Sequence, residues 1–321
     1  MGPNDRAATI PWTLFAVLFA STSVVVGVMW DISWHQTIGR DAFLTPAHLA
    51  IYVGGLAAGL ACGWLALKTT FAGTEEEKGR AVRFWGFRAP LGAWVAIWGT
   101  LAMLTSAPFD DWWHNAYGLD VQILSPPHVV LASGIIAIQI GALLMALAGQ
   151  NQSPDAGEPG ERKLSIAYLY AAGMLLAMVA VLISEYSFAN DMHGSTFYRI
   201  SLGVFPIVLF AVSRASRLAW AATTTALVYT GLVLAMMWIL PLFPAEARLA
   251  PIQRAVTHMV PPEFPLLLVF PAIARPSAAA VRRGGTGPRL DSRIPRKHRL
   301  SGHLPRRQLD VLGVHALRIS P

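Results

Sequence analysis

The chain has 321 residues, of which 54% are hydrophobic and only 13% charged, and its mean hydropathy is +0.48. This composition excludes an ordinary soluble domain and predicts an integral membrane protein with several spans. The net charge of +7 is unevenly placed, because residues 275–321 hold 11 Lys and Arg against two Asp. The single cysteine, Cys62, excludes a disulfide framework.

Apolar stretches long enough to cross about 30 Å of hydrocarbon recur along the chain. The expected helices are at 10–30, 46–67, 89–107, 127–148, 164–184, 198–213, 218–240 and 262–274. The apolar run within the last of them has 11 residues, which is too short to cross a bilayer. The predicted fold is therefore an all-α, polytopic membrane bundle of about eight spans in four hairpins.

A polar segment rich in Pro and Gly at 150–163 predicts a cytoplasmic linker between two membrane halves, 1–149 and 164–274. The basic tail at 275–321 has no apolar periodicity. It is interpreted either as a disordered segment that contacts anionic lipid or as the product of an altered reading frame. No nucleic-acid partner is expected.

Lys and Arg concentrate in the links that follow every second span. These cations are Lys68, Lys78, Arg80, Arg83, Arg88, Arg162, Lys163, Arg214 and Arg217. Because cytoplasmic loops of membrane proteins are enriched in cations, both termini are expected in the cytoplasm and the alternate loops on the outer side.

One outer loop with its flanking helix ends reads WDISWHQTIGRDAFLTPAH. Asp31 and His35 are four residues apart and so share one face of a helix. Thr45 followed by proline indicates a helix start, since Thr can cap and Pro loses no hydrogen bond at the first position. His48 then falls in the first turn of the next helix. Two His and one carboxylate on a hairpin predict a three-ligand metal site with open positions.

The pattern recurs as FDDWWHNAYGLDVQILSPPH. Asp110 and His114 are again four residues apart, and Ser125 with two prolines leads to His128. The two spacings are D-x3-H-x12-H and D-x3-H-x13-H. Two copies in the same place on two hydrophobic hairpins predict an internal repeat in the first half of the chain and a second metal site.

Further polar and aromatic side chains surround the two triads. Asp41 and Asp120 hold equivalent positions, and each is either a partner for the outer N–H of a metal-bound imidazole or an ordinary turn residue. Trp34 and Trp113 are expected to wall off the sites, or to belong to an interfacial aromatic belt. Weaker candidate ligands in the second half are Glu185, Asp191, His193 and His258.

The donor set narrows the choice of metal. No thiolate lies near either hairpin, which argues against Cys-based zinc and iron–sulfur sites. Imidazole with carboxylate suits copper, iron or zinc, and donor type alone does not separate them.

With these residues in place, the segment from about 30 to 130 resembles the metal-binding part of a membrane subunit of the particulate methane and ammonia monooxygenases. That family has the D-x3-H-x12-H spacing, a Trp before the first His, an Arg-Asp pair and T-P-x-H at a helix start. Its second site has Asn where this chain has Asp110. The resemblance implies copper bound by the two triads and oxidation of a small apolar or ammonia-like substrate by O2.

The expected function is thus that of a copper-binding, monooxygenase-like membrane protein. The alternative is a protein that transports or senses copper without turnover. Expected partners are the bilayer and either further oxygenase subunits or a copper-delivery protein, and the pattern is compatible with an oligomer.

Overall fold

The computed structural model describes residues 10–39, 43–118, 125–152, 159–184, 195–247 and 256–261. All of them belong to one unit, Met1–Ala279. Seven of the described helices are long and apolar enough to cross a membrane, so the prediction of a helical membrane bundle is confirmed at that level. The expected short eighth span and the basic tail lie outside the described residues.

The elements follow one another in a simple order. They are α1 (Trp12–Thr37), α2 (Pro46–Ala72), α3 (Glu75–Arg80), β1 (Val82–Phe84), β2 (Phe87–Ala89), α4 (Leu91–Tyr117), α5 (Pro126–Gln152), α6 (Pro159–Ser184), α7 (Ser195–Ala215), α8 (Ala221–Ile239) and the short 3-10 helix η2 (Leu240–Leu242). Residues 153–158 of the predicted linker lie outside the described residues. The predicted division at this linker stays a prediction.

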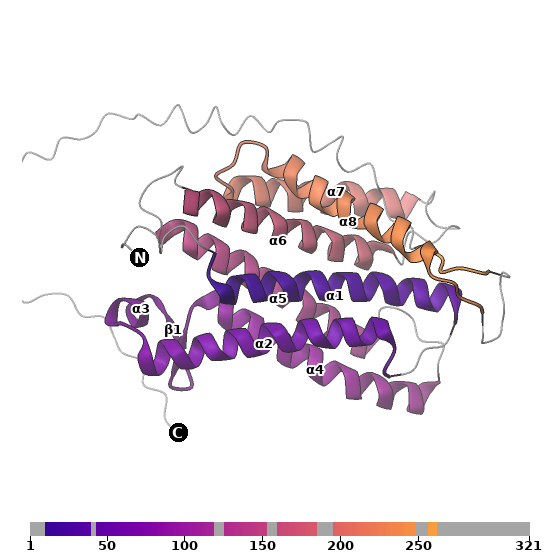
Figure 1. Cartoon of the computed structure of the whole chain (residues 1–321), viewed down its shortest axis with the longest axis horizontal. Coiled ribbons are helices and arrows are strands. Elements are labelled where there is room, and N and C mark those ends of the chain that lie inside the picture. The colour runs from indigo at the N-terminus through magenta and orange to yellow at the C-terminus, as the bar shows by residue number, and fades with distance from the viewer. Residues whose placement is uncertain are drawn as a thin grey trace, which may run out of the picture. The chain divides into compact units, whose positions relative to one another are not determined.

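The helices pack as two long antiparallel pairs with further helices beside them (Figure 1). The pairs with the most extensive contact are α1 with α2 and α4 with α5. These pairs meet through α2 with α4 and α1 with α5, while α6 packs on α5 and α1 and also contacts α8. A core of Leu, Val, Ala and Met side chains runs through this bundle.

Helices α1 and α4 continue well beyond the ends expected from hydrophobicity, which were residues 30 and 107. The extra turns carry charged and aromatic side chains, because backbone hydrogen bonds hold a helix together after its side chains become polar. Both helices end at a glycine with positive φ, 96° at Gly39 and 95° at Gly118. Glycine adopts this conformation without steric cost.

The predicted internal repeat has a counterpart in the packing. A Cβ added to Gly54 of α2 would lie 2.8 Å from the backbone oxygen of Ala20 on α1. A Cβ added to Gly134 of α5 would lie 2.6 Å from the backbone oxygen of Gly99 on α4. The two glycines are six residues after His48 and His128 respectively. Each hairpin therefore crosses closely at the same point of its repeat, which accounts for the small residues there.

This close approach yields a stability prediction. Gly134→Ala is expected to lower the free energy of unfolding by about 1–3 kcal/mol, because the new methyl group overlaps the α4 backbone. Gly63→Ala is the matched control, since a Cβ there meets nothing within 4 Å. It is expected to raise stability by about 0.5–1 kcal/mol through helix propensity. Thermal unfolding in one detergent measures both, and equal effects would contradict the packing explanation.

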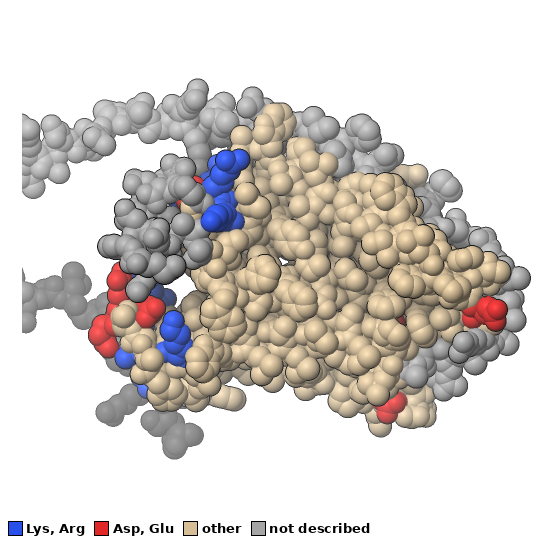
Figure 2. Space-filling view, in the orientation of Figure 1, with Lys and Arg blue, Asp and Glu red and all other residues tan. Residues whose placement is uncertain are grey.

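The link between α2 and α4 is more ordered than the loop expected there. It contains α3 with a complete capping box at Thr74 and Glu77, and then an antiparallel pair, β1 with β2. Figure 2 shows Lys and Arg gathered at this end of the bundle, with a surface almost without charge along its length. An uncharged lateral surface is what the hydrocarbon of a bilayer requires.

Candidate metal centres

The first triad is assembled by the end of α1 and the start of α2. Asp31 and His35 occupy the last turns of α1, and His48 lies in the first turn of α2. Thr45 caps α2 by accepting a hydrogen bond from the His48 N–H at 3.1 Å. The two oxygens of Asp31 lie 3.6 Å from His35 Nε2 and 3.4 Å from His48 Nε2. One carboxylate thus faces two imidazoles from different helices.

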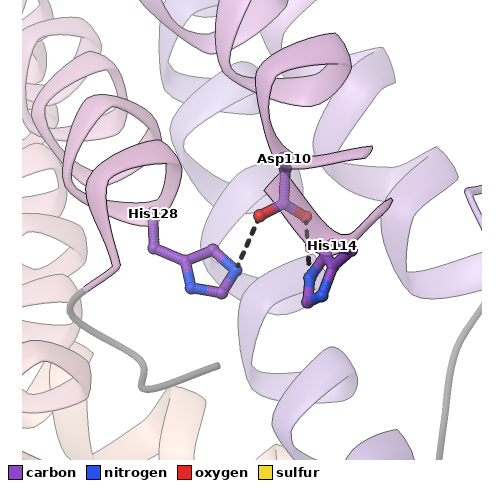
Figure 3. A group of neighbouring side chains, drawn as sticks. All are labelled: Asp110, His114 and His128. Atoms are coloured by element: carbon purple, nitrogen blue, oxygen red, sulfur yellow. Dashed lines mark ion pairs between the residues drawn. The ribbon is translucent and has the colours of Figure 1, made fainter. Parts of the chain in front are cut away.

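The second triad repeats this arrangement on α4 and α5. Figure 3 shows the Asp110 carboxylate between the two rings, with His114 on its own helix and His128 on the next one. The Asp110 oxygens lie 3.4 Å from His114 Nε2 and 3.5 Å from His128 Nε2. One ligand-type atom from each of the three residues lies within 4.8 Å of the others.

These separations suit a shared ion better than direct hydrogen bonds. An N–H···O hydrogen bond usually measures about 2.9 Å. Two ligand atoms about 2.0–2.1 Å from one ion, at a tetrahedral angle, lie about 3.4 Å apart. The four His–Asp distances of 3.4–3.6 Å match the second case.

The partners of the other ring nitrogens determine which nitrogen is available. His48 Nδ1 lies 3.3 Å from the backbone oxygen of Phe43, and His114 Nδ1 lies 3.3 Å from that of Gly118. A carbonyl oxygen only accepts, so Nδ1 carries the proton and donates. In a neutral ring the lone pair is then on Nε2, the nitrogen that faces the aspartate.

His128 is held differently, by a side chain. Its Nδ1 lies 3.0 Å from the hydroxyl oxygen of Ser125, the residue before α5. A metal-bound imidazole is commonly oriented by such a contact through its second nitrogen.

A lone pair opposite a carboxylate needs a positive charge between them. Oδ1 of Asp110 is buried and accepts no hydrogen bond from the described residues, although it lies 3.5 Å from His128 Nε2. Either a proton on the imidazole or a bound cation would satisfy both groups. The residues therefore fit a metal ion, with one carboxylate oxygen and two Nε2 atoms as ligands.

Both triads remain accessible from the end of the bundle. The side chains of the second triad are 27–34% exposed, and that of His35 is 50% exposed. Three protein ligands at a partly open surface leave coordination positions for small molecules.

Aromatic side chains border each site. Trp113 packs against Phe109 and Tyr117, with ring centroids 6.1 and 4.5 Å away. Trp34 and Trp30 line a cavity of about 310 Å³ between the end of α1 and the segment that follows η2. Its other walls are Ile38, Phe243, Pro244, Ala245, Glu246 and Met259. The tryptophans thus form walls next to the ligands, and one wall adjoins space for a small molecule.

The remaining predicted candidates divide into two groups. Asp41, Asp120, Glu185, Asp191 and His193 lie outside the described residues. His258 is described and exposed, and its Nδ1 lies 2.9 Å from the hydroxyl of its neighbour Thr257. This position gives His258 a local partner rather than a place in either triad.

Sequence analysis did not anticipate the groups that hold the outer ring nitrogens. The Phe43 and Gly118 contacts come from backbone oxygens, which leave no signature in the residue type. Ser125 was visible as a helix-start residue, and its position three residues before a histidine is the signal that could have suggested this second role.

Comparison of the chain with protein-family models, with curated proteins and with solved structures found no match.

Proposed function

We propose that this chain is a copper-binding integral membrane protein of the monooxygenase type, with one ion in each Asp-His-His triad. The observation that carries the proposal is the equivalence of the two triads, in which a single carboxylate faces two Nε2 atoms at 3.4–3.6 Å. Buried or interfacial ionisable groups in membrane helices are costly and usually serve a function.

The donor set supports a transition metal with a preference for nitrogen. The only cysteine, Cys62, is buried within α2, so these sites have imidazole and carboxylate donors and no thiolate. Imidazole suits copper, iron and zinc alike. The choice of copper comes from the resemblance of residues 30–130 to the oxygenase family.

The protein groups around the sites suit a small substrate. Copper would supply redox chemistry with O2 at the open coordination positions. The aspartate of each triad offsets part of the ionic charge, and the outer ring contacts hold each Nε2 toward it. Trp34 and Trp113 limit access of water, and the cavity beside α1 could receive a small, largely apolar molecule.

The proposal includes an orientation in the membrane. The described Lys and Arg between α2 and α4, at the start of α6 and around the α7–α8 link occupy the end of the bundle opposite the triads. By the positive-inside rule that end faces the cytoplasm, and the metal sites open on the outer side. Further oxygenase subunits are the partners that this assignment favours.

Metal loading of the purified full-length chain tests the proposal. After exposure to Cu(II) and removal of loosely held ions, we expect about two copper ions per chain and an electron paramagnetic resonance spectrum with nitrogen ligands. His35→Ala combined with His114→Ala should abolish both features. Copper content that this double substitution leaves unchanged would refute the assignment, and tighter retention of iron or zinc in parallel samples would refute copper.

A second candidate function is copper handling without turnover. The exposure of His35, 50% of its side chain, favours it because an ion there is open to exchange with a delivery protein. This function predicts copper binding without any O2-dependent product. Oxygen consumption by the copper-loaded chain, with small alkane and amine substrates in separate samples, distinguishes the two.

A further inference from the structure

The β-hairpin between α2 and α4 carries two arginines opposite each other. In its antiparallel register Arg83 pairs with Arg88, between the pairs Val82 with Ala89 and Phe84 with Phe87. Side chains of directly opposed residues lie on one face of the strands, and like charges in such a pair are destabilising. An anion between the two guanidinium groups would remove that cost.

Nearby carboxylates are already engaged elsewhere. Within α3, Glu75 pairs with Lys78 at 3.3 Å and Glu76 pairs with Arg80 at 2.5 Å. Glu77 accepts the Thr74 N–H at 2.8 Å as part of the capping box. In the described part of the chain, no carboxylate lies within ion-pair distance of Arg83 or Arg88. The pair is therefore a local excess of positive charge.

The turn that joins the two strands places a tryptophan in a strained conformation. Trp85 has φ of 46° and is followed by Gly86 with φ of 86°. Two-residue hairpin turns of this kind favour Asn, Asp or Gly, because a positive φ is unfavourable for a bulky side chain. The Trp85 side chain is nevertheless 83% exposed. Strain at an exposed aromatic residue points to a function for that residue.

Trp85 belongs to a larger aromatic group at this end of the bundle. Phe84 packs on Trp85, Trp94 and Trp98, with ring centroids 5.0, 5.4 and 5.5 Å away. Trp98 itself is 46% exposed. Tryptophan is enriched where membrane hydrocarbon meets headgroups, because its ring is amphipathic.

The hairpin is fixed against the helices rather than free. The Thr70 hydroxyl on α2 accepts the Arg88 N–H at 2.8 Å, and Arg88 Nη1 donates to the backbone oxygen of Lys78 at 2.9 Å. On the other side, Trp94 Nε1 donates to the backbone oxygen of Val82 at 3.0 Å. Since α2 and α4 are both long enough to span, this fixed hairpin lies at the membrane surface.

We propose that the hairpin Val82–Ala89 is a binding site for an anionic phospholipid. Arg83 and Arg88 hold the headgroup phosphate between them, with Arg88 also bound to α3. Trp85 and Trp98 insert at the boundary between headgroups and acyl chains. Guanidinium groups suit phosphate because their planar donors match its oxygens. The site lies at the end of the bundle opposite the metal triads, so it is independent of the proposed copper chemistry.

Competition between lipids on the full-length chain tests this site. Native mass spectrometry in detergent, with equal phosphatidylglycerol and phosphatidylcholine, should show preferential retention of phosphatidylglycerol. Arg83→Gln with Arg88→Gln should weaken that lipid about 30-fold, because each cation near a membrane surface contributes about tenfold or slightly less. Trp85→Gly should weaken it too, while Arg214→Gln, an exposed cation at the same end of the bundle, should not.

Each other outcome would overturn the proposal. Equal retention of the two lipids by the unsubstituted chain would show that no anionic site exists. Unchanged binding in the double arginine variant, with Arg83→Lys plus Arg88→Lys as its charge-preserving control, would place the lipid elsewhere. Displacement of the lipid by millimolar inorganic phosphate would show a site for small anions instead.

Discussion

Replacing Asp110 with Ala is expected to remove the ion of the second site and to leave the first site loaded. Bound copper should fall from about two ions to about one per chain, because the two imidazoles would lose the carboxylate that offsets the ionic charge. Loss of a direct ligand should cost more than the 10–100-fold in affinity that is typical of outer partners. Copper analysis after dialysis against a weak chelator measures this change.

The neighbouring acid supplies a matched control. Asp111 has the same charge and is exposed, and its carboxylate contacts only Asn115, at 3.4 Å, among the described residues. Asp111→Ala should therefore leave copper content unchanged. Asp110→Asn keeps one ligand oxygen without the charge, so its affinity should fall between those of the unsubstituted chain and Asp110→Ala. Equal copper loss from the Asp110→Ala and Asp111→Ala variants would reduce the effect to general surface charge.

Replacing Ser125 with Ala should weaken copper at the second site by about 10–100-fold, although Ser125 is not a ligand. The hydroxyl is the partner of His128 Nδ1 at 3.0 Å, and without it the ring loses its orientation toward Asp110. Copper titration of the second site alone, in a His35→Ala background, measures the change. A parallel thermal unfolding experiment separates ring orientation from loss of a helix cap.

The equivalent residue of the first hairpin provides the comparison. The Thr45 hydroxyl accepts a hydrogen bond from the His48 backbone N–H, whereas the His48 ring is held by the backbone oxygen of Phe43. Thr45→Ala should therefore cost about 1 kcal/mol of stability with little change in copper affinity at the first site. If both substitutions changed copper affinity equally, the hydroxyls would act through helix capping alone.

Two features of the sequence predicted most of the membrane bundle. Runs of apolar residues placed seven spans close to where the structure has them, since a helix across hydrocarbon must satisfy its own backbone and present apolar side chains. The helix-start signal at Thr45 placed His48 in the first turn of α2. Both signals act within a few residues of the chain.

Other features depend on residues far apart in the sequence and were not foreseen. The β-hairpin at 82–89 is fixed by Thr70 of α2 and Trp94 of α4, and neither contact has a local signature. The extension of α1 beyond residue 30 was also missed, because hydropathy marks where the apolar surface ends rather than where the helix does.

The sequence alone determined the residue types of the two triads and their spacing, because i, i+4 placement on a helix and a Pro-led helix start are local rules. Only the tertiary structure decided that His48 meets Asp31, and His128 meets Asp110, at 3.4–3.5 Å. Those contacts require two helices to cross at a set distance, and small residues such as Gly54 and Gly134 allow that crossing. The distance between helices is a property of side chains packed across the pair, which no single stretch of sequence contains.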